Sequence, residues 1–441
     1  MKKINRRNFL KGSGLVTLSS LGGLQLGFAK NILKGGQGGS GKDLLVYVFL
    51  NGGMDGLNML PPRSGANYNH YVDLRPDLHI PNNQSLSLNG QSQFGMHPLA
   101  TGMRDLFNAN KMAIVHATGM VESNRSHFEA TKFLELGYMG NSGPSTGWLT
   151  RYFTSANSSA NAQIPSLVPS YDTSDAFLAD SEALVVSDPS NFALNYGHWS
   201  WEDEMQNTLF KINESPNSLE QQAAKHALSS SAVIQSIDWD NYTPGNNADY
   251  PDSFFGEQMK SLAQLYKSDV GLEVAYVPTG GWDTHTGQGS GITGTFADLT
   301  SNLSRGLYAL YQDLTASHEG QFTIVVQSEF GRRAYQNSDN STDHGYGNPM
   351  FIIGDEVVPG FHGQYPGLAS HQLYQGDDVD VTVDYRDVVS EILMKRMKNR
   401  YLGYIFPGYD AYTELGVVNG QAMTPNYDTE IDVIFKTGFD G

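Results

Sequence analysis

The sequence predicts an α/β fold in which a mostly parallel central sheet is flanked by helices. Short apolar runs with the length and β-branched content of buried strands recur along the chain, and segments with helical spacing lie between them. Such alternation is typical of a parallel sheet with helices packed on its faces. Several runs end in a glycine-containing or polar turn, and open α/β sheets bind ligands at the carboxyl ends of their strands. We therefore expect a single domain over residues 43–441, with its functional site at the strand ends.

The expected elements follow one another in chain order. The apolar runs that we interpret as strands lie at residues 43–50, 112–115, 272–277, 322–326 and 349–353. The first of them, DLLVYVFL, is almost continuously apolar, as expected of a central strand that is covered on both faces. Helical spacing is found at residues 98–109, 129–137, 200–212, 218–236, 254–268, 295–316 and 384–398.

Two segments depart from this alternation. Residues 61–96 contain prolines and many Asn, Ser and Gln but few periodic apolar residues, so we expect a loop there. The composition also changes over residues 155–269, where irregular stretches rich in Ser and Asn separate helical ones. We interpret this second segment as a helical insertion, or cap, that covers the strand ends.

Composition and charge narrow the class of protein. The 441 residues include 28 Lys and Arg against 46 Asp and Glu, which gives a formal net charge of −18. With no basic stripe to neutralise phosphates, a nucleic acid or an anionic membrane is disfavoured as a partner. The sequence contains no Cys, so it needs no disulfide and makes no iron–sulfur cluster.

The N-terminal segment has the features of a targeting signal. Residues 1–29 begin with basic residues, among them Arg6 and Arg7, and continue in a short apolar run that Gly and Ser dilute. This order is typical of a twin-arginine export signal, which exports folded proteins, and a disordered basic tail is the alternative. Residues 30–42 are a Gly-rich linker. We therefore expect a bacterial protein of the periplasm or cell surface without a membrane span.

The turn after the first predicted strand carries Asp55. Glycines at positions 52, 53 and 56 surround it, and glycine permits a positive φ and a close approach of the backbone to a ligand. A carboxylate in this position can bind a divalent cation. The alternative is an Asp that caps the following helix or satisfies the turn.

Arg125, Ser126 and His127 lie between the second predicted strand and the next helix. A Ser near a helix N-terminus sits in a positive potential that stabilises a nearby anion, so Ser126 is a candidate nucleophile. Arg125 and His127 are candidates to clamp a phosphate or sulfate group or to assist proton transfer. The alternative is that Ser126 only caps the helix.

Asp283 and His285 follow the strand predicted at residues 272–277. Residues two apart in an extended backbone face the same side, so both side chains can converge on one cation, whereas a helix would send them apart. A structural Asp–His pair is the alternative. The spacing therefore favours a metal site after this strand.

The last two predicted strands carry the remaining candidates. Glu329 and Arg332 follow the earlier of the two, Glu329 as a ligand or a base and Arg332 as an anion clamp. Asp343 and His344 lie in the polar loop before the later one. His344 is the best single ligand candidate, with Asp343 as a ligand or as its hydrogen-bond partner.

Longer motifs surround these residues in the order FLNGGMDGLNMLPP (49–62), NRSHFEATKFLELG (124–137), GWLTRY (147–152), GWDTHTGQ (281–288) and QSEFGRR…TDHGYGNPMFIIG (327–354). With the twin-arginine leader, they make the chain resemble the bacterial family catalogued as domain of unknown function 1501. That family is grouped with the alkaline phosphatase and sulfatase superfamily. The resemblance implies an alkaline phosphatase-like α/β core with metal ligands at its strand ends.

Carried over by position, the resemblance implies particular roles. Asp55 matches the first-strand Asp ligand, Ser126 the nucleophile, Asp283 and His285 the ligands of the middle strand, and His344 the late His ligand. The chain also departs from the superfamily, because Glu329 and Phe330 stand where adjacent Asp and His are usual, and because the spacing from Asp283 to His285 is shorter than usual. We therefore expect one divalent metal (Zn, Mg or Ca) rather than two, or none.

Two functions follow as expectations. The first is an exported, metal-dependent hydrolase of phosphate esters or, less favoured, sulfate esters, with a small-molecule or glycan ester as substrate. Sulfatase chemistry is the weaker option because a formylglycine derived from Cys is excluded. The second is a non-catalytic periplasmic binding or assembly factor that retains the fold with a degraded site. A second exported protein would then be its partner.

Overall fold

The computed structural model describes residues 43–140, 143–156, 162–192, 202–215, 217–289, 291–318 and 320–431. The expected signal at residues 1–29 and the linker at residues 30–42 lie outside the described residues. Among the helices that are described, none is both long and apolar enough to span a membrane.

A nine-stranded sheet forms the centre of the molecule, in the order β10-β4-β9-β8-β1-β7-β5-β6, with β13 also paired to β4. Its strands are β1 (Leu44–Leu50), β4 (Met112–Gly119), β5 (Ser166–Val168), β6 (Leu184–Val185), β7 (Val274–Thr279), β8 (Phe322–Ser328), β9 (Asn348–Ile353), β10 (Gly360–His362) and β13 (Val383–Asp384). Among the described pairs of this sheet, only those that β9 makes are antiparallel. The prediction of a mostly parallel sheet flanked by helices is confirmed.

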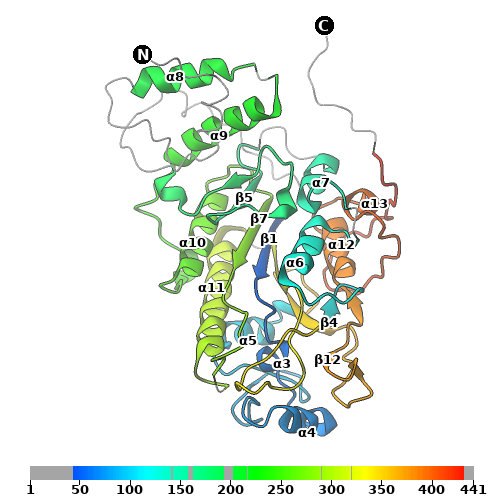
Figure 1. Cartoon of the computed structure of the whole chain (residues 1–441). Coiled ribbons are helices and arrows are strands. Elements are labelled where there is room, and N and C mark those ends of the chain that lie inside the picture. Colours follow the sequence, from blue (N-terminus) through cyan, green and yellow to red (C-terminus); the bar gives the residue numbers. More distant parts are fainter. Residues whose placement is uncertain are drawn as a thin grey trace.

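Seven of the nine helices named next coincide with predicted helical segments, whereas α7 and α13 were not predicted. The nine are α5 (Thr101–Asn108), α6 (His127–Leu136), α7 (Trp148–Ser155), α8 (Glu202–Ile212), α9 (Leu219–Gln235), α10 (Phe254–Lys267), α11 (Thr295–His318), α12 (Tyr385–Lys395) and α13 (Leu402–Ile405). Figure 1 shows α10 and α11 on one side of the sheet and α6 and α12 on the other. The architecture is therefore three-layered, with the sheet between two layers of helices.

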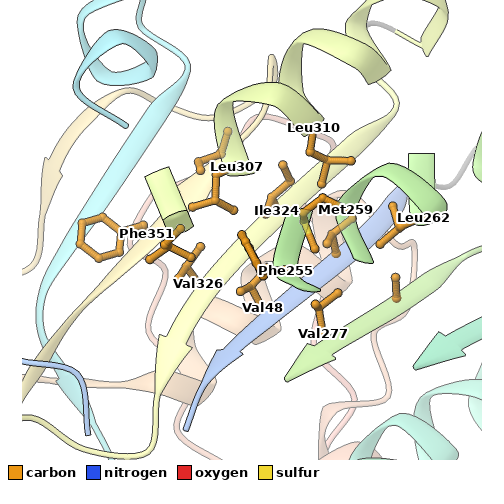
Figure 2. Packing of buried hydrophobic residues seen from close by; sticks show 14 of the residues in the cluster. Val48, Phe255, Met259, Leu262, Val277, Leu307, Leu310, Ile324, Val326 and Phe351 are labelled. Carbon is orange, nitrogen blue, oxygen red and sulfur yellow. The ribbon is translucent and has the colours of Figure 1, made fainter. Parts of the chain in front are cut away.

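The central strand β1 shows why both faces are covered. All seven of its residues are buried, and successive side chains of a strand point to opposite faces. Val46 and Val48 belong to the core under α5, α10 and α11, whereas Tyr47 and Phe49 belong to the core under α6, α7 and α12. Figure 2 shows the first of these cores, where α10 and α11 place Phe255 and other apolar side chains over Val48 and its neighbours.

The direction of β9 was not evident from the sequence, which suggested another parallel strand. β9 is antiparallel to both β8 and β4. A strand of reversed direction begins at the edge of the sheet where its neighbours end. The loop that precedes β9 therefore lies at the carboxyl ends of β4 and β8, so the reversal keeps Asp343 and His344 beside the other candidates.

Two further segments differ from expectation. The segment 61–96, predicted to be a loop, contains the helix α4 (Gly65–Leu74) and the short strands β2 (Leu86–Ser87) and β3 (Gly95–Met96). Within residues 155–269, β5, β6 and α10 belong to the central layers rather than to a separate cap. Figure 1 places α8 and α9 at the end of the sheet opposite α3 (Gly56–Met59), the helix that follows β1. These two helices therefore do not cover the carboxyl ends of the strands, because the chain has returned to the amino end of the sheet there.

Candidate metal centre

Segments that are far apart in the sequence meet at one edge of the sheet. The strands β1, β4, β7 and β8 share one direction, so their carboxyl ends lie at the same edge, where β9 begins. The loops at this edge carry Ser126 and His127 after β4, Asp283 and His285 after β7, Glu329 and Arg332 after β8, and Asp343 and His344 before β9. The sheet thus gathers the candidates that the sequence places at its strand ends.

Asp283 is at the centre of the arrangement. Its Oδ1 lies 3.3 Å from Nε2 of His127, 3.1 Å from Nε2 of His285 and 3.2 Å from Nε2 of His344. The ligand atoms of His127, Asp283 and His344 all lie within 4.8 Å of one another, and Nε2 of His285 is 2.7 Å from Nε2 of His344. Neighbouring ligand atoms around a tetrahedral zinc with bonds of about 2.0–2.1 Å are about 3.3 Å apart. The contacts of Asp283 therefore have the spacing of ligands on one ion.

Each of the three imidazole rings is held at its Nδ1 by an oxygen that accepts a hydrogen bond. The pairs are His127 with Oε1 of Glu329 at 2.6 Å, His285 with Oδ1 of Asp343 at 2.8 Å, and His344 with the carbonyl of Arg125 at 2.7 Å. Because a carboxylate or carbonyl oxygen cannot donate, Nδ1 carries the hydrogen, and a neutral imidazole then has a lone pair at Nε2. Such a partner behind a metal-binding His fixes its tautomer and its orientation.

The hydrogen bonds at Nδ1 direct the Nε2 atoms of His127, His285 and His344 toward Oδ1 of Asp283. Partial burial opposes ionisation of Asp283, but the Arg332 guanidinium, with His344 and His127 beside it, outweighs burial and lowers the pKa of this carboxyl to about 2. Within the part of the chain that the structure describes, the buried Nε2 of His127 has no hydrogen-bond partner. A divalent cation would satisfy these donors together, and imidazole nitrogen with carboxylate oxygen is a donor set that suits Zn²⁺.

The cluster is open to solvent on one side. The side chain of Asp283 is 46% exposed, that of His285 40% and that of His344 22%. On the other side, the buried ring of Phe330 lies 4.9 Å from the ring of His127 and 5.0 Å from that of His344. The Phe that stands where a second His was expected therefore forms an apolar wall behind a single cluster.

Arg332 is not placed to clamp an ester, which corrects the role expected of it. Its side chain is fully buried, and it lies 2.7 Å from Oδ1 of Asp283. Its remaining donors bind backbone carbonyls, those of Gly52, Gly53, Trp282 and Thr342. The guanidinium therefore fixes Asp283 and the turn after β1 instead of facing the open side.

The glycines of that turn are required by close packing. Gly52 has φ +124° and Gly53 has φ +65°, values that side-chain-bearing residues rarely adopt. A Cβ on Gly52 would lie 2.3 Å from the backbone nitrogen of Asp283, and one on Gly53 would lie 2.6 Å from the ring of Phe330. The turn thus approaches the loop that carries Asp283 closely enough to exclude any larger residue.

Glu329 also has a supporting position rather than the expected one of ligand or base. Its side chain is 1% exposed, and its Oε1 accepts hydrogen bonds from His127 and from the backbone nitrogen of Gly52. Its Oε2 accepts from the hydroxyl of Ser328. The hydrogen bond with Glu329 raises the pKa of His127. The role of this carboxylate is therefore to orient His127.

Asp55 lies outside the cluster, and the structure supports the capping role that the sequence left open. Its Oδ1 accepts from the backbone nitrogen of Asn58 at 3.4 Å, as the N-cap of α3. Its carboxylate forms an ion pair with Arg75 at 2.7 Å, and both side chains are fully buried. Gln288 donates a further hydrogen bond at 2.5 Å. With these partners, Asp55 has a structural place that needs no metal.

This placement predicts the effect of Asp55→Ala. The substitution leaves Arg75 buried without its counter-ion, and removal of one partner of a buried pair destabilises a fold by about 3–5 kcal/mol. We expect a loss of that size in the free energy of unfolding, measured by urea denaturation. The exposed Asp73 is the control, because Asp73→Ala should change stability by no more than about 0.5 kcal/mol. A stable Asp55→Ala protein that had lost a bound metal would instead make Asp55 a ligand.

Ser126 and Arg125 flank the cluster at the start of α6. Ser126 is the N-cap residue of this helix, yet its side chain makes no capping hydrogen bond and is exposed. The hydroxyl is therefore free of the structural role that was its alternative. Arg125 lies against the buried Asp378, with its Nε 3.0 Å from Oδ2, and its Nη2 also reaches Gln375. The Arg125 guanidinium is thus partly engaged, and its carbonyl holds His344.

Sequence reasoning missed several residues that support the site. Arg75, Gln288, Asp378 and Asn337 bind Asp55, Arg125 or Asp343, and none of them was among the predicted site residues. It also assigned His127 to proton transfer or anion binding, whereas the structure places its Nε2 among the ligand atoms. The signal for His127 was present, since it stands after a strand as the other candidate ligands do.

Comparisons with known proteins complete this description. No curated protein matches the chain. Among solved structures, the crystal structure of Ps i-CgsB in complex with k-i-k-neocarrahexaose has a TM-score of 0.35 at 11% identity and covers 74% of this chain and 69% of that one. The structure of PH0037 protein from Pyrococcus horikoshii has a TM-score of 0.19 at 12% identity and covers 71% and 88%. These TM-scores are too low to indicate a shared fold.

A family of proteins does match part of the sequence. Residues 201–399 fit the family described as "Protein of unknown function (DUF1501)". This segment includes Asp283, His285 and His344, together with Glu329 and Arg332 that hold the site in place. Over this segment, which is a little less than half of the chain, the sequence is similar to the DUF1501 family.

Proposed function

We propose that this chain is an exported, metal-dependent hydrolase-like protein that acts on phosphate esters or, as the weaker option, on sulfate esters. The single observation that carries the proposal is the convergence of three Nε2 atoms on Oδ1 of Asp283, at 3.1–3.3 Å. Because each ring is held by an oxygen at Nδ1, the converging atoms are all acceptors, which a cation would unite.

The donor set selects among the expected metals. Mg²⁺ and Ca²⁺ prefer sites made of oxygen ligands, whereas imidazole nitrogens with one carboxylate suit Zn²⁺. We therefore propose one zinc-like ion, held by Asp283, His127 and His344 with His285 beside them. When bound, such an ion would polarise an ester oxygen and favour ionisation of a nearby hydroxyl.

The start of α6 supplies the other elements of an ester hydrolase. Ser126 offers a free hydroxyl and stands in the sequence between Arg125, whose carbonyl holds His344, and His127. Its Oγ would attack phosphorus in line and lose its proton to solvent, while the bond from phosphorus to the alcohol oxygen breaks and the alcohol leaves with a proton taken from solvent. Water would then attack the phosphoserine, which releases inorganic phosphate and restores the Ser126 hydroxyl. Within the described residues, no side chain caps the first backbone N–H groups of this ten-residue helix, so they can receive the anionic oxygens.

Export is the second part of the proposal. It rests on the twin-arginine pattern around Arg6 and Arg7 and the apolar run after it. A pathway that carries folded proteins would allow a metal to be bound before export. The periplasm or the cell surface is therefore the proposed location, and fractionation of cells that express the full chain would test it.

Metal content and turnover together test the function. Mature protein purified from the periplasm is analysed by inductively coupled plasma mass spectrometry and assayed with p-nitrophenyl phosphate and p-nitrophenyl sulfate, with and without a chelator. We expect a near-stoichiometric metal and turnover of the phosphate ester that chelation abolishes. A folded parent that contains no metal would overturn the proposal and favour the binding or assembly factor. The full engagement of Arg332 with the protein already agrees with that alternative.

A further inference from the structure

A cleft of about 630 Å³ lies at the same edge of the sheet as the candidate metal centre. This volume is within the roughly 300–1,000 Å³ of small-molecule sites. Its walls come from the ends of β1 and β7, from α6, from the loop after β5 and from the first turns of α10 and α11. Figure 1 shows α6 on one side of β1 and β7, and α10 and α11 on the other. The cleft is therefore bounded by elements of both helical layers.

The cleft and the metal centre share the helix α6. His127 belongs to the cluster, and Thr131 and Glu135, four and eight residues later, line the cleft. Residues four apart lie on one face of a helix, about 6 Å apart along its axis. Asn51 also lines the cleft and precedes Gly52, which packs against Asp283. A ligand in the cleft can therefore place one end at the metal centre.

The lining of the cleft selects a polar and uncharged ligand. Among the described residues that form it, none is Lys, Arg or His, and Glu135 and Asp172 are acidic. Anions are therefore disfavoured in the cleft itself. Amide and hydroxyl side chains make up much of the wall, and within the described part of the chain those of Asn51, Thr131 and Thr173 have no hydrogen-bond partner in the protein. These groups can both donate and accept, as a ligand rich in hydroxyls requires.

Glu135 fixes the floor of the cleft. Its Oε1 accepts hydrogen bonds from the hydroxyls of Tyr276 at 2.7 Å and Ser174 at 2.8 Å, and its Oε2 accepts from the backbone nitrogen of Asp175 at 3.0 Å. Burial raises the pKa of this carboxyl. The bonds join α6, β7 and the loop after β5, so the polar wall is already organised before a ligand binds.

Phe254 lines the cleft, and Tyr171 lies next to it, between the lining residues Ser170 and Asp172. The rings of Tyr171 and Phe254 are stacked, with centroids 5.6 Å apart and planes at 11°. Tyr171 is 79% exposed and Phe254 47%, although most large aromatic rings are largely buried. Two exposed stacked rings above a polar wall are a surface that suits a partner with one apolar face and a hydroxyl-bearing edge. A pyranose ring has both, since its axial C–H bonds form a face and its hydroxyls an edge.

We propose that this cleft binds a neutral saccharide, with its ring on the face of Tyr171 and its hydroxyls on the amides and hydroxyls of the wall. Where the proposed function also holds, the saccharide is the alcohol part of the ester, and its ester group reaches the metal centre. The substrate class would then be a sugar phosphate or sugar sulfate. The binding of the saccharide itself needs no metal.

Saccharide binding by the mature protein tests the inference. The probes are cellotriose, maltotriose, mannotriose and xylotriose, with trigalacturonate as an anionic comparison, and the measurements are isothermal titration calorimetry and saturation-transfer NMR. We expect at least one neutral probe to bind more tightly than trigalacturonate. Tyr171→Ala should weaken that binding about tenfold, whereas Tyr171→Phe should retain it. Tyr427→Ala, which removes an exposed aromatic ring outside the cleft, should leave it unchanged.

The outcome can be separated from that of the proposed function. In Asp283→Asn, which alters the metal centre, we expect saccharide binding to persist while turnover of p-nitrophenyl phosphate is lost. If no neutral saccharide binds the parent, or if Tyr171→Ala binds as well as the parent, the inference is overturned, whatever the esterase assay shows. Absent turnover with intact saccharide binding would overturn only the proposed function.

Discussion

Asp283→Asn is expected to remove the bound metal and, with it, ester turnover. Oδ1 of Asp283 is the atom that contacts Nε2 of all three imidazoles, so loss of its negative charge weakens every pairing with a cation at once. Loss of a hydrogen-bond partner behind a ligand typically lowers metal affinity or activity about 10–100-fold. We expect a larger loss here, measured as metal content by mass spectrometry and as zinc affinity by competition titration.

The substitution is designed to leave the fold intact. The amide oxygen of Asn can still accept from Arg332, whose other donors remain bound to backbone carbonyls. Asp343→Asn is a graded comparison, because it removes only the carboxylate that holds His285 and should lower affinity about 10–100-fold. Zinc at 100 times its Kd should stabilise the parent by about 2.7 kcal/mol and should not stabilise Asp283→Asn. Equal metal binding by both proteins would show that the ion does not lie at Asp283.

The fold and the candidate site could be predicted from the sequence to different extents. The ends of the strands could be predicted because the apolar runs have the length of strands and because neighbouring parallel strands end at one edge of the sheet. That rule alone brought Asp283, His285 and His344 together across about 60 positions of sequence. It worked even though β9 is antiparallel, because the loop before a reversed strand reaches the same edge.

The direction in which a polar side chain points could not be predicted from the sequence. Glu329 and Arg332 both follow β8, and their residue types fit a base and an anion clamp as well as they fit supports. What decides between these roles is the position of backbone carbonyls in the turn after β1, which Arg332 binds, and of His127, which Glu329 binds. Those partners come from other strands, so only the tertiary arrangement assigns the two roles.

Asp55 shows the same limit for an ion pair. Its partner Arg75 comes just after α4, in a segment that lacked the periodic apolar residues of a helix. Four of the first six residues of α4 are Gly, Asn or His, and its N-cap Ser64 makes no capping bond, so no local signal marked it. Without the helix there was no reason to expect a buried Arg beside Asp55, and its carboxylate remained a free ligand candidate.

Ser126→Ala is expected to abolish ester turnover while metal binding persists. The hydroxyl is the nucleophile of the proposed reaction, and removal of an attacking group lowers turnover by several orders of magnitude. None of the four clustered atoms, Oδ1 of Asp283 and Nε2 of the three His residues, belongs to Ser126, so zinc affinity should stay that of the parent. Steady-state assays with p-nitrophenyl phosphate measure the loss of turnover, and a parallel competition titration measures the zinc affinity.

A second Ser at the N-terminus of a helix supplies the matched control. Ser218 caps α9 with a hydrogen bond from the backbone nitrogen of Gln221 at 3.3 Å, whereas Ser126 makes no such bond. Ser218→Ala should therefore lose about 0.5–2 kcal/mol of stability and keep turnover, and Ser126→Ala should do the reverse. If Ser126→Ala loses stability but not turnover, Ser126 is a helix cap after all, and water rather than a side chain attacks the ester.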